Sequence, residues 1–541
     1  MRSLPYLLPT LISSTLAYCP IPGPLLPPPV LAPALNLSGP AIDNSTFTSW
    51  HSKPWVDNTS FAITASLSGA ELFHFEHIDP DYARNVSVCN TQFRIGSVTK
   101  IFTILAVLLS KDQIGWRDPI TKYVDGLKGD VWDEVTIESL AGQTSGLGKN
   151  GYVGDLVYQG ASVAALLNLP KAGNTIPNCD YAALDGVRVC TQNEVIELFN
   201  SPQWLPESPG TGPAYSNLAY NLLGIALAKA HGKSYEQVIT DLITQPLGLD
   251  NTGFERNAKG GAILPNPGDN WWTADFANFN PTGGLWSSAN DLLKVEQAIL
   301  SNRFLSPSET RFWLKPASLT ASLHQAVGAP WEIFRPDTLD TTYKRPIDLY
   351  TKEGDIPGYA SYAILIPEYN VTIAIMVAGN QYSAAIHDLF PMIVEHLVPY
   401  TDNLARKQAE RKYVGTYANS NDSIITVAQD SGPGLTITAW RNDGVDLRKS
   451  LSTLVGIPLN NFSIRLYPAD PDSFAKTEKW RLSFEKIKNE NSFADQDCQG
   501  WVHADNYRYI QERLDELLFT IDDGKAVEVN LPAWRTTLVR R

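Results

Sequence analysis

Residues 93–109 read Phe-Arg-Ile-Gly-Ser-Val-Thr-Lys-Ile-Phe-Thr-Ile-Leu-Ala-Val-Leu-Leu, and this stretch decides the fold. Ser97 stands just before the apolar run from Ile101 to Leu109, whose period and length predict a buried helix. A serine at a helix start and a lysine three residues later, here Lys100, lie on one face of the first turn. The lysine amine can then hold the serine hydroxyl and take its proton, which makes the serine a nucleophile.

The Ser-x-x-Lys spacing is a weak signal by itself, because the chain contains it three times, at Ser97, Ser473 and Ser483. Ser473 stands among proline and aspartate residues in a predicted loop, and Ser483 lies in a strand pattern near the C-terminus. Only Ser97 opens an apolar helix. Ser97 is therefore the candidate nucleophile, with Lys100 as its base.

A second stretch, residues 209–220, carries Tyr215 and Asn217 in a predicted loop. Side chains two residues apart in extended backbone point to the same side. A tyrosine phenol has a pKa of about 10, and neighbouring lysine amines lower this pKa, so that the phenolate can act as a general base. The alternative is a tyrosine that packs at the start of the following helix.

The third stretch is residues 349–355, where Lys352 lies on a predicted strand and Gly354 follows two residues later. A glycine at this place lets a substrate approach the backbone of the strand. Lys352 could hold both Tyr215 and a substrate carboxylate. The alternative is an ordinary surface lysine on a strand.

Taken in this order, the three stretches resemble the motifs of the serine β-lactamase, penicillin-binding-protein and class C-like esterase superfamily. That superfamily carries Ser-x-x-Lys, Tyr-x-Asn and Lys-Thr-Gly or His-x-Gly. The likeness covers roughly residues 55–400 and includes four accessory stretches, at residues 94–96, 143–147, 209–211 and 283–287. It implies an α+β fold, an α/β sandwich in which helices flank an antiparallel sheet and a helical subdomain meets the sheet at Ser97.

The resemblance also implies a role for each residue. Ser97 is the acylated nucleophile, and Lys100 and Tyr215 share the general acid and base work. The backbone N–H groups of Ser97 and Asp355 form the oxyanion hole. The substrate-binding positions that the resemblance implies are Asn217, Lys352, Gly354 and Asp355. In these roles Asn217 orients Lys100 and the acyl group, and Lys352 supports Tyr215 electrostatically.

The expected activity is that of a secreted serine hydrolase, which works through an acyl-enzyme on a small ester, amide, or lactone or lactam. Glu353 and Asp355 depart from the superfamily pattern, and their negative charges disfavour substrates with a carboxylate. One alternative is an acyltransferase of the same fold, because the same residues serve both reactions. The other is a non-catalytic binding protein that uses the same pocket.

Two other kinds of hydrolase are disfavoured. The chain has no Gly-x-Ser-x-Gly elbow of a Ser-His-Asp lipase, and its eight histidines lack the spacing of a metal enzyme. We therefore expect neither a metal nor a cofactor. The net charge of −14 argues against nucleic acid and anionic membranes as partners. The expected partner is a small-molecule substrate, and the oligomeric state stays open.

Composition divides the chain of 541 residues into four parts. Residues 1–17 have the short basic start, apolar run and small residues of a secretory signal peptide. Residues 18–45 are rich in proline, and residues 46–400 hold the three motifs. Residues 401–541 begin with a charged helical pattern and continue as short β-type runs separated by turns, which predicts a smaller all-β domain. The C-terminal part resembles the additional domain of secreted fungal members of the superfamily.

The sequence also predicts covalent features of a secreted glycoprotein. The Asn-x-Ser/Thr acceptors for glycosylation are Asn36, Asn44, Asn58, Asn85, Asn370, Asn421 and Asn461. Cys179 and Cys190 bracket a short loop, which favours a disulfide between them. Of the other three cysteines, Cys89 could pair with Cys498, which leaves Cys19 as the candidate unpaired residue.

Overall fold

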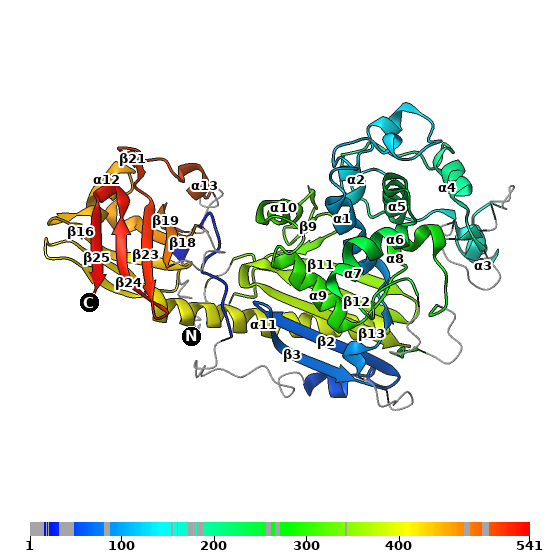
Figure 1. Cartoon of the computed structure of the whole chain (residues 1–541), viewed down its shortest axis with the longest axis horizontal. Coiled ribbons are helices and arrows are strands. Elements are labelled where there is room, and N and C mark those ends of the chain that lie inside the picture. The colour runs from blue at the N-terminus through cyan, green and yellow to red at the C-terminus, as the bar shows by residue number, and fades with distance from the viewer. Residues whose placement is uncertain are drawn as a thin grey trace, which may run out of the picture. The chain divides into compact units, whose positions relative to one another are not determined.

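The computed structural model describes residues 16–17, 19, 21–31, 48–79, 87–152, 155–159, 161–170, 177, 179–180, 188–255, 261–265, 271–340, 343, 345–469, 476–489 and 497–541. The chain forms two compact units (Figure 1). The larger unit contains residues 31–339 and 346–398. The second, which we call the barrel unit, contains residues 1–30, 340–345 and 399–541. Most of the predicted signal peptide, residues 1–15, lies outside the described residues.

The centre of the larger unit is an antiparallel sheet in the strand order β3-β2-β13-β12-β11-β10-β9-β8. Its strands are β2 (Thr59–Leu67), β3 (Ala70–His77), β8 (Ser318–Leu319), β9 (Gln325–Val327), β10 (Glu332–Phe334), β11 (Leu349–Ile356), β12 (Tyr359–Ile366) and β13 (Val371–Gly379). Every residue of β2, β12 and β13 is buried. Continuous apolar strands of this kind require cover on both faces of the sheet.

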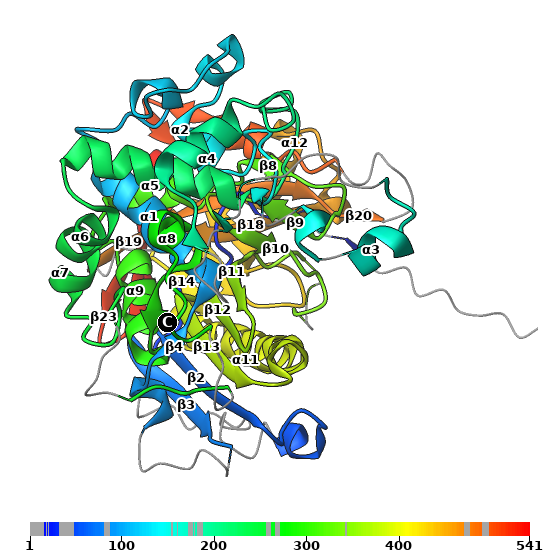
Figure 2. The same cartoon turned by 90° about the vertical axis from the view of Figure 1, so that its right-hand side faces the viewer.

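Helices supply this cover. Helix α9 (Ala289–Leu300) packs on β2, β12 and β13, and α11 (Tyr382–Tyr413) lies on the other side, where Phe390 stacks on Tyr362 with ring centroids 4.5 Å apart. Figure 2 shows α9 and α11 on opposite sides of β12 and β13. The predicted α+β architecture is therefore confirmed, with an antiparallel sheet between helices.

A helical region packs beyond α9. It is built around α1 (Thr99–Leu109), α2 (Ile137–Ala141), α5 (Asn217–His231), α6 (Tyr235–Ile239) and α8 (Asn280–Gly283). Helix α1 is buried from Thr99 to Val107, as its apolar run predicts. Helix α5 ends at Gly232, whose φ of 61° is the left-handed conformation that glycine adopts at helix C-termini.

Two predicted helix boundaries are wrong. The hydrophobic period of residues 286–301 predicts a helix over this stretch. In the structure, Trp286–Ser287 forms strand β7 and α9 begins at Ala289. The reason is Ser288, whose side chain accepts a hydrogen bond from Asp291 N and caps the helix. The charged helix predicted at residues 402–413 is the last part of α11, which has 32 residues.

The barrel unit is a closed antiparallel barrel. Its eight strands are β14 (Gly415–Ala418), β15 (Ile424–Ala428), β16 (Leu435–Asn442), β18 (Phe462–Pro468), β19 (Thr477–Lys486), β23 (Glu516–Asp522), β24 (Lys525–Leu531) and β25 (Thr536–Arg540). Pairing of β15 with both β14 and β16 closes the ring. Tyr413, Trp480 and Phe519 fill its interior, as expected for a barrel of this size. The predicted all-β character is confirmed.

One of the two predicted cysteine pairings is wrong. Cys179 and Cys190 form the predicted disulfide, but Cys19 pairs with Cys498 and Cys89 is free and buried. The pairing follows from the N-terminal segment, whose apolar residues pack in the core of the barrel unit. Cys19 and Cys498 therefore lie 5.4 Å apart between their Cα atoms. Cys89 lies in the core of the larger unit.

Four of the seven predicted glycosylation acceptors can be placed. Asn58 and Asn421 are exposed, and Asn370 and Asn461 are partly exposed. Asn36, Asn44 and Asn85 lie outside the described residues. Among the helices within the described ranges, none is both long and apolar enough to cross a membrane.

Glu296 gives the larger unit a pH-dependent stability. This α9 residue is buried, and burial holds the pKa of its carboxyl well above the usual 4.5. The folded state therefore binds the proton more tightly than the unfolded chain does, so stability is full below about pH 4.5 and falls as the pH rises toward the folded pKa. We expect Glu296→Gln to be more stable than the wild type at pH 8, by a margin that grows by up to about 1.4 kcal/mol per pH unit.

Urea unfolding of both proteins between pH 4 and pH 9 measures this margin. The exposed Glu395, replaced by glutamine, is the control and should show no such trend. A margin for Glu296→Gln that stays constant over this range would contradict the assignment.

Candidate active site

The candidate nucleophile lies where the turn before α1 meets strand β11. Gly96 has a φ of +47°, and a side chain there would come within 2.9 Å of Asp355 N. A side chain on Gly354 would come within 2.0 Å of Ile95 O. Two glycines therefore allow the backbone of β11 to lie directly against the turn that carries Ser97.

The structure brings the predicted Ser97, Lys100, Tyr215 and Asn217 together. Lys100 Nζ donates to Ser97 Oγ at 3.0 Å, to Asn217 Oδ1 at 2.8 Å and to Thr282 O at 2.7 Å. Tyr215 OH donates to Ser97 Oγ at 2.8 Å. The serine oxygen thus lies between an amine and a phenol, each of which can exchange a proton with it.

Local structure explains how the second motif reaches the site. Ser216 is the N-cap of α5, and its side chain accepts a hydrogen bond from Ala219 N. Tyr215 and Asn217 flank this cap. Gln143 Oε1 accepts from Ser216 N at 2.7 Å and holds the same turn from the other side.

Burial and charge tune the two groups that touch Ser97. The pKa of Lys100 is lowered to about 8. Burial is the largest cause and the charge of the nearby Lys352 acts in the same direction, whereas Tyr215 opposes them. Burial by itself would raise the pKa of Tyr215, but the charges of Lys100 and Lys352 outweigh it, and the net pKa is below the usual 10. A larger fraction of both groups is therefore deprotonated near neutral pH than in water.

Lys352 is held by a carboxylate that the sequence analysis did not identify. Its Nζ donates to Glu332 Oε1 at 2.5 Å and to Glu353 O at 2.7 Å, and lies 5.2 Å from the centre of the Tyr215 ring. Although burial opposes the charge, Glu332 and Tyr215 hold the pKa of Lys352 above its usual value. Glu332 lies on β10, a strand of only three residues that no sequence pattern indicated.

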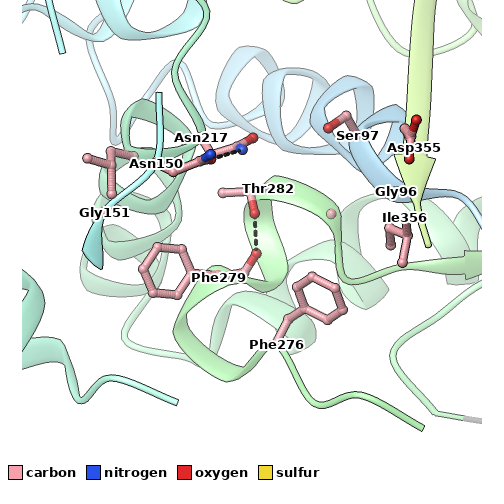
Figure 3. A pocket seen from close by; sticks show the side chains of 12 residues that line it. Gly96, Ser97, Asn150, Gly151, Asn217, Phe276, Phe279, Thr282, Asp355 and Ile356 are labelled. Atoms are coloured by element: carbon pink, nitrogen blue, oxygen red, sulfur yellow. Dashed lines mark hydrogen bonds between the residues drawn. The ribbon is translucent and has the colours of Figure 1, made fainter. Parts of the chain in front are cut away.

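A pocket opens beside Ser97 (Figure 3). Asn217 Nδ2 donates to Asn150 Oδ1 at 2.7 Å, so two amides form its polar side. Phe276 and Phe279 lie on the apolar side of the same pocket. The sequence analysis missed Asn150 and both phenylalanines, because they belong to segments that only the tertiary fold brings to Ser97.

The two acidic residues of the third motif have different surroundings. Glu353 Oε2 accepts from Tyr362 OH at 3.0 Å, on the face of β12 where Tyr362 stacks on Phe390 of α11. Asp355 lines the pocket and accepts a long hydrogen bond from Tyr382 OH, at 3.4 Å. Burial raises the pKa of both carboxyls. Of the two, only Asp355 lies in the pocket wall.

The arrangement predicts a pH dependence for the nucleophile. With the pKa of Lys100 at about 8, the rate at which a fluorophosphonate labels Ser97 should rise through pH 8 if the neutral amine takes the serine proton. The charge of Glu332 raises the pKa of both Lys100 and Lys352. Glu332→Gln should therefore move the inflection to lower pH.

Labelling rates between pH 5 and pH 10 test this shift, with the exposed Glu395→Gln as the matched control. An inflection that stays in place, or moves to higher pH, would show that Glu332 does not act on the base.

The fold and the site define a protein with an activated serine between an antiparallel sheet and a helical region. A Beta-lactamase family profile matches residues 84–390, and a profile described as "Beta-lactamase-like-like, C-terminal domain" matches residues 405–541. The chain therefore belongs to the beta-lactamase family. The superfamily indicated by the three motifs is confirmed.

Several known proteins are similar to this chain. A "Beta-lactamase-like protein" from Arthroderma benhamiae is 30% identical over 596 aligned positions, which cover 99% of this chain and 98% of that protein. A "Probable hydrolase clz13" from Cochliobolus lunatus is 26% identical over 89% of this chain and 85% of its own length. A solved structure of a Yersinia pestis beta-lactamase/D-alanine carboxypeptidase with citrate has 21% identity and a TM-score of 0.48, and covers 64% of this chain and 94% of that one.

Proposed function

We propose that the protein is a serine hydrolase that forms an acyl-enzyme on Ser97. The observation that carries this proposal is the pair of hydrogen bonds on Ser97 Oγ, from Lys100 Nζ at 3.0 Å and Tyr215 OH at 2.8 Å. A serine hydroxyl needs a nearby base to become a nucleophile, and both partners have lowered pKa values. A purely structural serine has no need of two such groups.

Each residue has a role in the proposed reaction. The neutral Lys100 amine or the Tyr215 phenolate takes the Ser97 proton while Oγ forms a bond to the carbonyl carbon of the substrate. The N–H groups of Ser97 and Asp355 stabilise the oxyanion, because the Gly96 contact places these two backbones together. When the bond to the leaving group breaks, the protonated Lys100 or Tyr215 gives its proton to the leaving group. The same base then takes a proton from water while the water oxygen bonds the acyl carbon. The bond from this carbon to Ser97 Oγ breaks, Oγ takes back the proton, and the acid product leaves.

The proposed substrate is a small, uncharged ester, amide, or lactone or lactam. Lys352 could bind a substrate carboxylate, but two hydrogen bonds already tie it to Glu332 and to Glu353 O. Its Nζ also lies 5.2 Å from the centre of the Tyr215 ring. A second cation, the exposed Lys149, lies 5.8 Å from the centre of the Tyr215 ring. Asp355 adds a carboxylate to the pocket wall, and Phe276 and Phe279 provide an apolar surface. These features favour a neutral substrate with an apolar group.

Labelling with a fluorophosphonate, followed by peptide mapping, tests the nucleophile. We expect an adduct on the Ser97 peptide of the wild type and of Ser473→Ala, the control from another Ser-x-x-Lys motif, but none in Ser97→Ala. Folded wild-type protein that gives no adduct would contradict the proposal and favour a binding protein of this fold.

A pair of chromogenic esters tests the substrate class. We expect p-nitrophenyl butyrate to be hydrolysed with at least about tenfold higher kcat/KM than mono-p-nitrophenyl succinate, whose carboxylate would be repelled by Asp355 in the pocket wall. Equal rates would overturn the preference for neutral substrates. Transfer of the acyl group to an added alcohol, in preference to water, would indicate the acyltransferase of the same fold.

We also infer that the protein works outside the cytosol. Two disulfides support this location, because cytosolic thiols are kept reduced. The signal-peptide pattern of residues 1–17 and the Asn-x-Ser/Thr acceptors agree with it. N-terminal sequencing of protein secreted by a eukaryotic host should find a start close to residue 18.

A further inference from the structure

A second pocket of the larger unit lies between the β2–β3 turn, the start of β13 and the C-terminal half of α9. It shares no residue with the pocket beside Ser97. Its lining includes the buried hydroxyls of Ser66 and Thr372, which are 2.7 Å apart, and the more accessible Ser301 and Gln297. Leu247 adds an apolar side chain.

Each cation of this pocket has a hydrogen-bond partner, and that of Lys294 is a carboxylate. Lys294 Nζ bonds Asp291 Oδ1 at 2.9 Å, and Arg303 donates to Pro246 O at 3.0 Å. The remaining lining groups are hydroxyls and amides, which can both donate and accept hydrogen bonds. This chemistry suits a neutral polyhydroxyl compound, such as a sugar, better than an anion.

Asn370 lies in the wall of this pocket and begins the sequence Asn370-Val371-Thr372, a glycosylation acceptor. Its backbone is held on both sides: its N–H donates to Pro367 O at 3.1 Å, and its carbonyl accepts from Ser68 N at 2.8 Å. Its φ of 53° is a left-handed conformation that asparagine tolerates. Within the described part of the chain, its side-chain amide makes no hydrogen bond, so Nδ2 is available for modification.

We propose that Asn370 carries an N-linked glycan whose first sugars lie in this pocket. In the modification, the amide nitrogen bonds the anomeric carbon of an oligosaccharide carried on a lipid diphosphate. The anomeric C–O bond breaks, the lipid diphosphate leaves with the electron pair, and the amide proton passes to a base of the transferring enzyme. Because the transfer occurs on the chain during secretion, the burial of Thr372 in the folded protein does not prevent it.

Two other glycosylation acceptors of the same chain can be compared with Asn370. Asn421 is exposed, and its Oδ1 accepts from Ser420 Oγ at 3.3 Å. Asn58 is also exposed, and neither residue lines the pocket that Asn370 lines. A glycan on Asn421 or Asn58 should therefore extend into solvent, whereas hydroxyls and the Gln297 amide can bind the first sugars on Asn370.

Endoglycosidase H tests the proposal, because it cuts between the first two sugars of a high-mannose glycan. The full chain is secreted from a yeast host, digested either folded or after denaturation, and mapped by mass spectrometry. We expect the Asn370 peptide to carry a glycan that is cut at least about tenfold more slowly in the folded protein than after denaturation. An unmodified Asn370, or equal rates in the two states, would overturn the proposal.

Substitutions show whether the pocket causes the protection. Gln297→Ala should restore cutting at Asn370 in the folded protein, whereas the exposed Gln113→Ala, outside the pocket, should not. Glycans on Asn421 or Asn58 should be cut at similar rates in both states. Ester hydrolysis, measured in parallel, should be unchanged by Gln297→Ala, so this result is independent of the proposed catalytic function.

Discussion

A Ser97→Ala variant is expected to lose almost all hydrolysis of p-nitrophenyl butyrate, with kcat/KM lower by a factor of about 10⁴ or more. The reason is that no other oxygen occupies the position between Lys100 Nζ and Tyr215 OH in the described structure. The variant keeps the pocket but cannot form the acyl-enzyme. Steady-state kinetics with the purified full chain measure the loss.

Two comparisons make this result specific. The thermal unfolding temperature of Ser97→Ala should match that of the wild type within a few degrees, because the change removes one oxygen atom at the edge of a pocket. Tyr215→Phe should keep the ring but lose the phenol, and should lower kcat by about 10²–10⁴. Activity of Ser97→Ala close to that of the wild type would exclude Ser97 as the nucleophile.

An Arg406→Met variant is expected to destabilise the barrel unit by about 3–5 kcal/mol. Arg406 belongs to a buried cluster of two arginines and two aspartates: its Nε bonds Asp402 Oδ2 at 2.8 Å, and its Nη2 lies 3.7 Å from Asp340 Oδ2. Arg345 lies 3.3 Å from Asp340 and 3.9 Å from Asp402. Removing Arg406 takes one cation away from two buried carboxylates, and part of the cost of desolvating these carboxylates is no longer offset.

Urea unfolding of the full chain, followed by tryptophan fluorescence, measures this effect as a shift of the transition of the barrel unit. Arg441→Met is the matched control from the same unit. Arg441 pairs with Asp422 at 2.8 Å, but both side chains are about half exposed, so the loss should be below about 1 kcal/mol. Equal shifts for the two variants would show that the buried cluster contributes no more than a surface pair.

Local features of this protein could be predicted from its sequence because they depend on neighbouring residues. The contact between Lys100 and Ser97 follows from a spacing of three residues at a helix start. Helix α5, the apolar strands β12 and β13, and the short strands of the barrel follow from hydrophobic period and turn residues. The Cys179–Cys190 disulfide joins two cysteines with a sequence separation of only 11.

Contacts between distant segments could not be predicted in this way. Glu332 reaches Lys352 because β10 pairs with β11 in a register that sets Glu332 opposite Thr351, and the sequence shows no sign of this register. Asn150 and the two phenylalanines enter the pocket from segments far from Ser97 in sequence. Cys19 meets Cys498 across 479 residues, because apolar residues of the N-terminal segment are buried in the barrel unit.

The sequence alone thus determined the candidate nucleophile and base, the motif order and the class of fold, since each rests on short spacings and local periodicity. The tertiary structure decided which charge neutralises Lys352, which side chains shape the pocket and which cysteines pair. These choices depend on strand register and on the packing of distant segments, where the free energy comes from burial and from charge pairing rather than from local backbone preference.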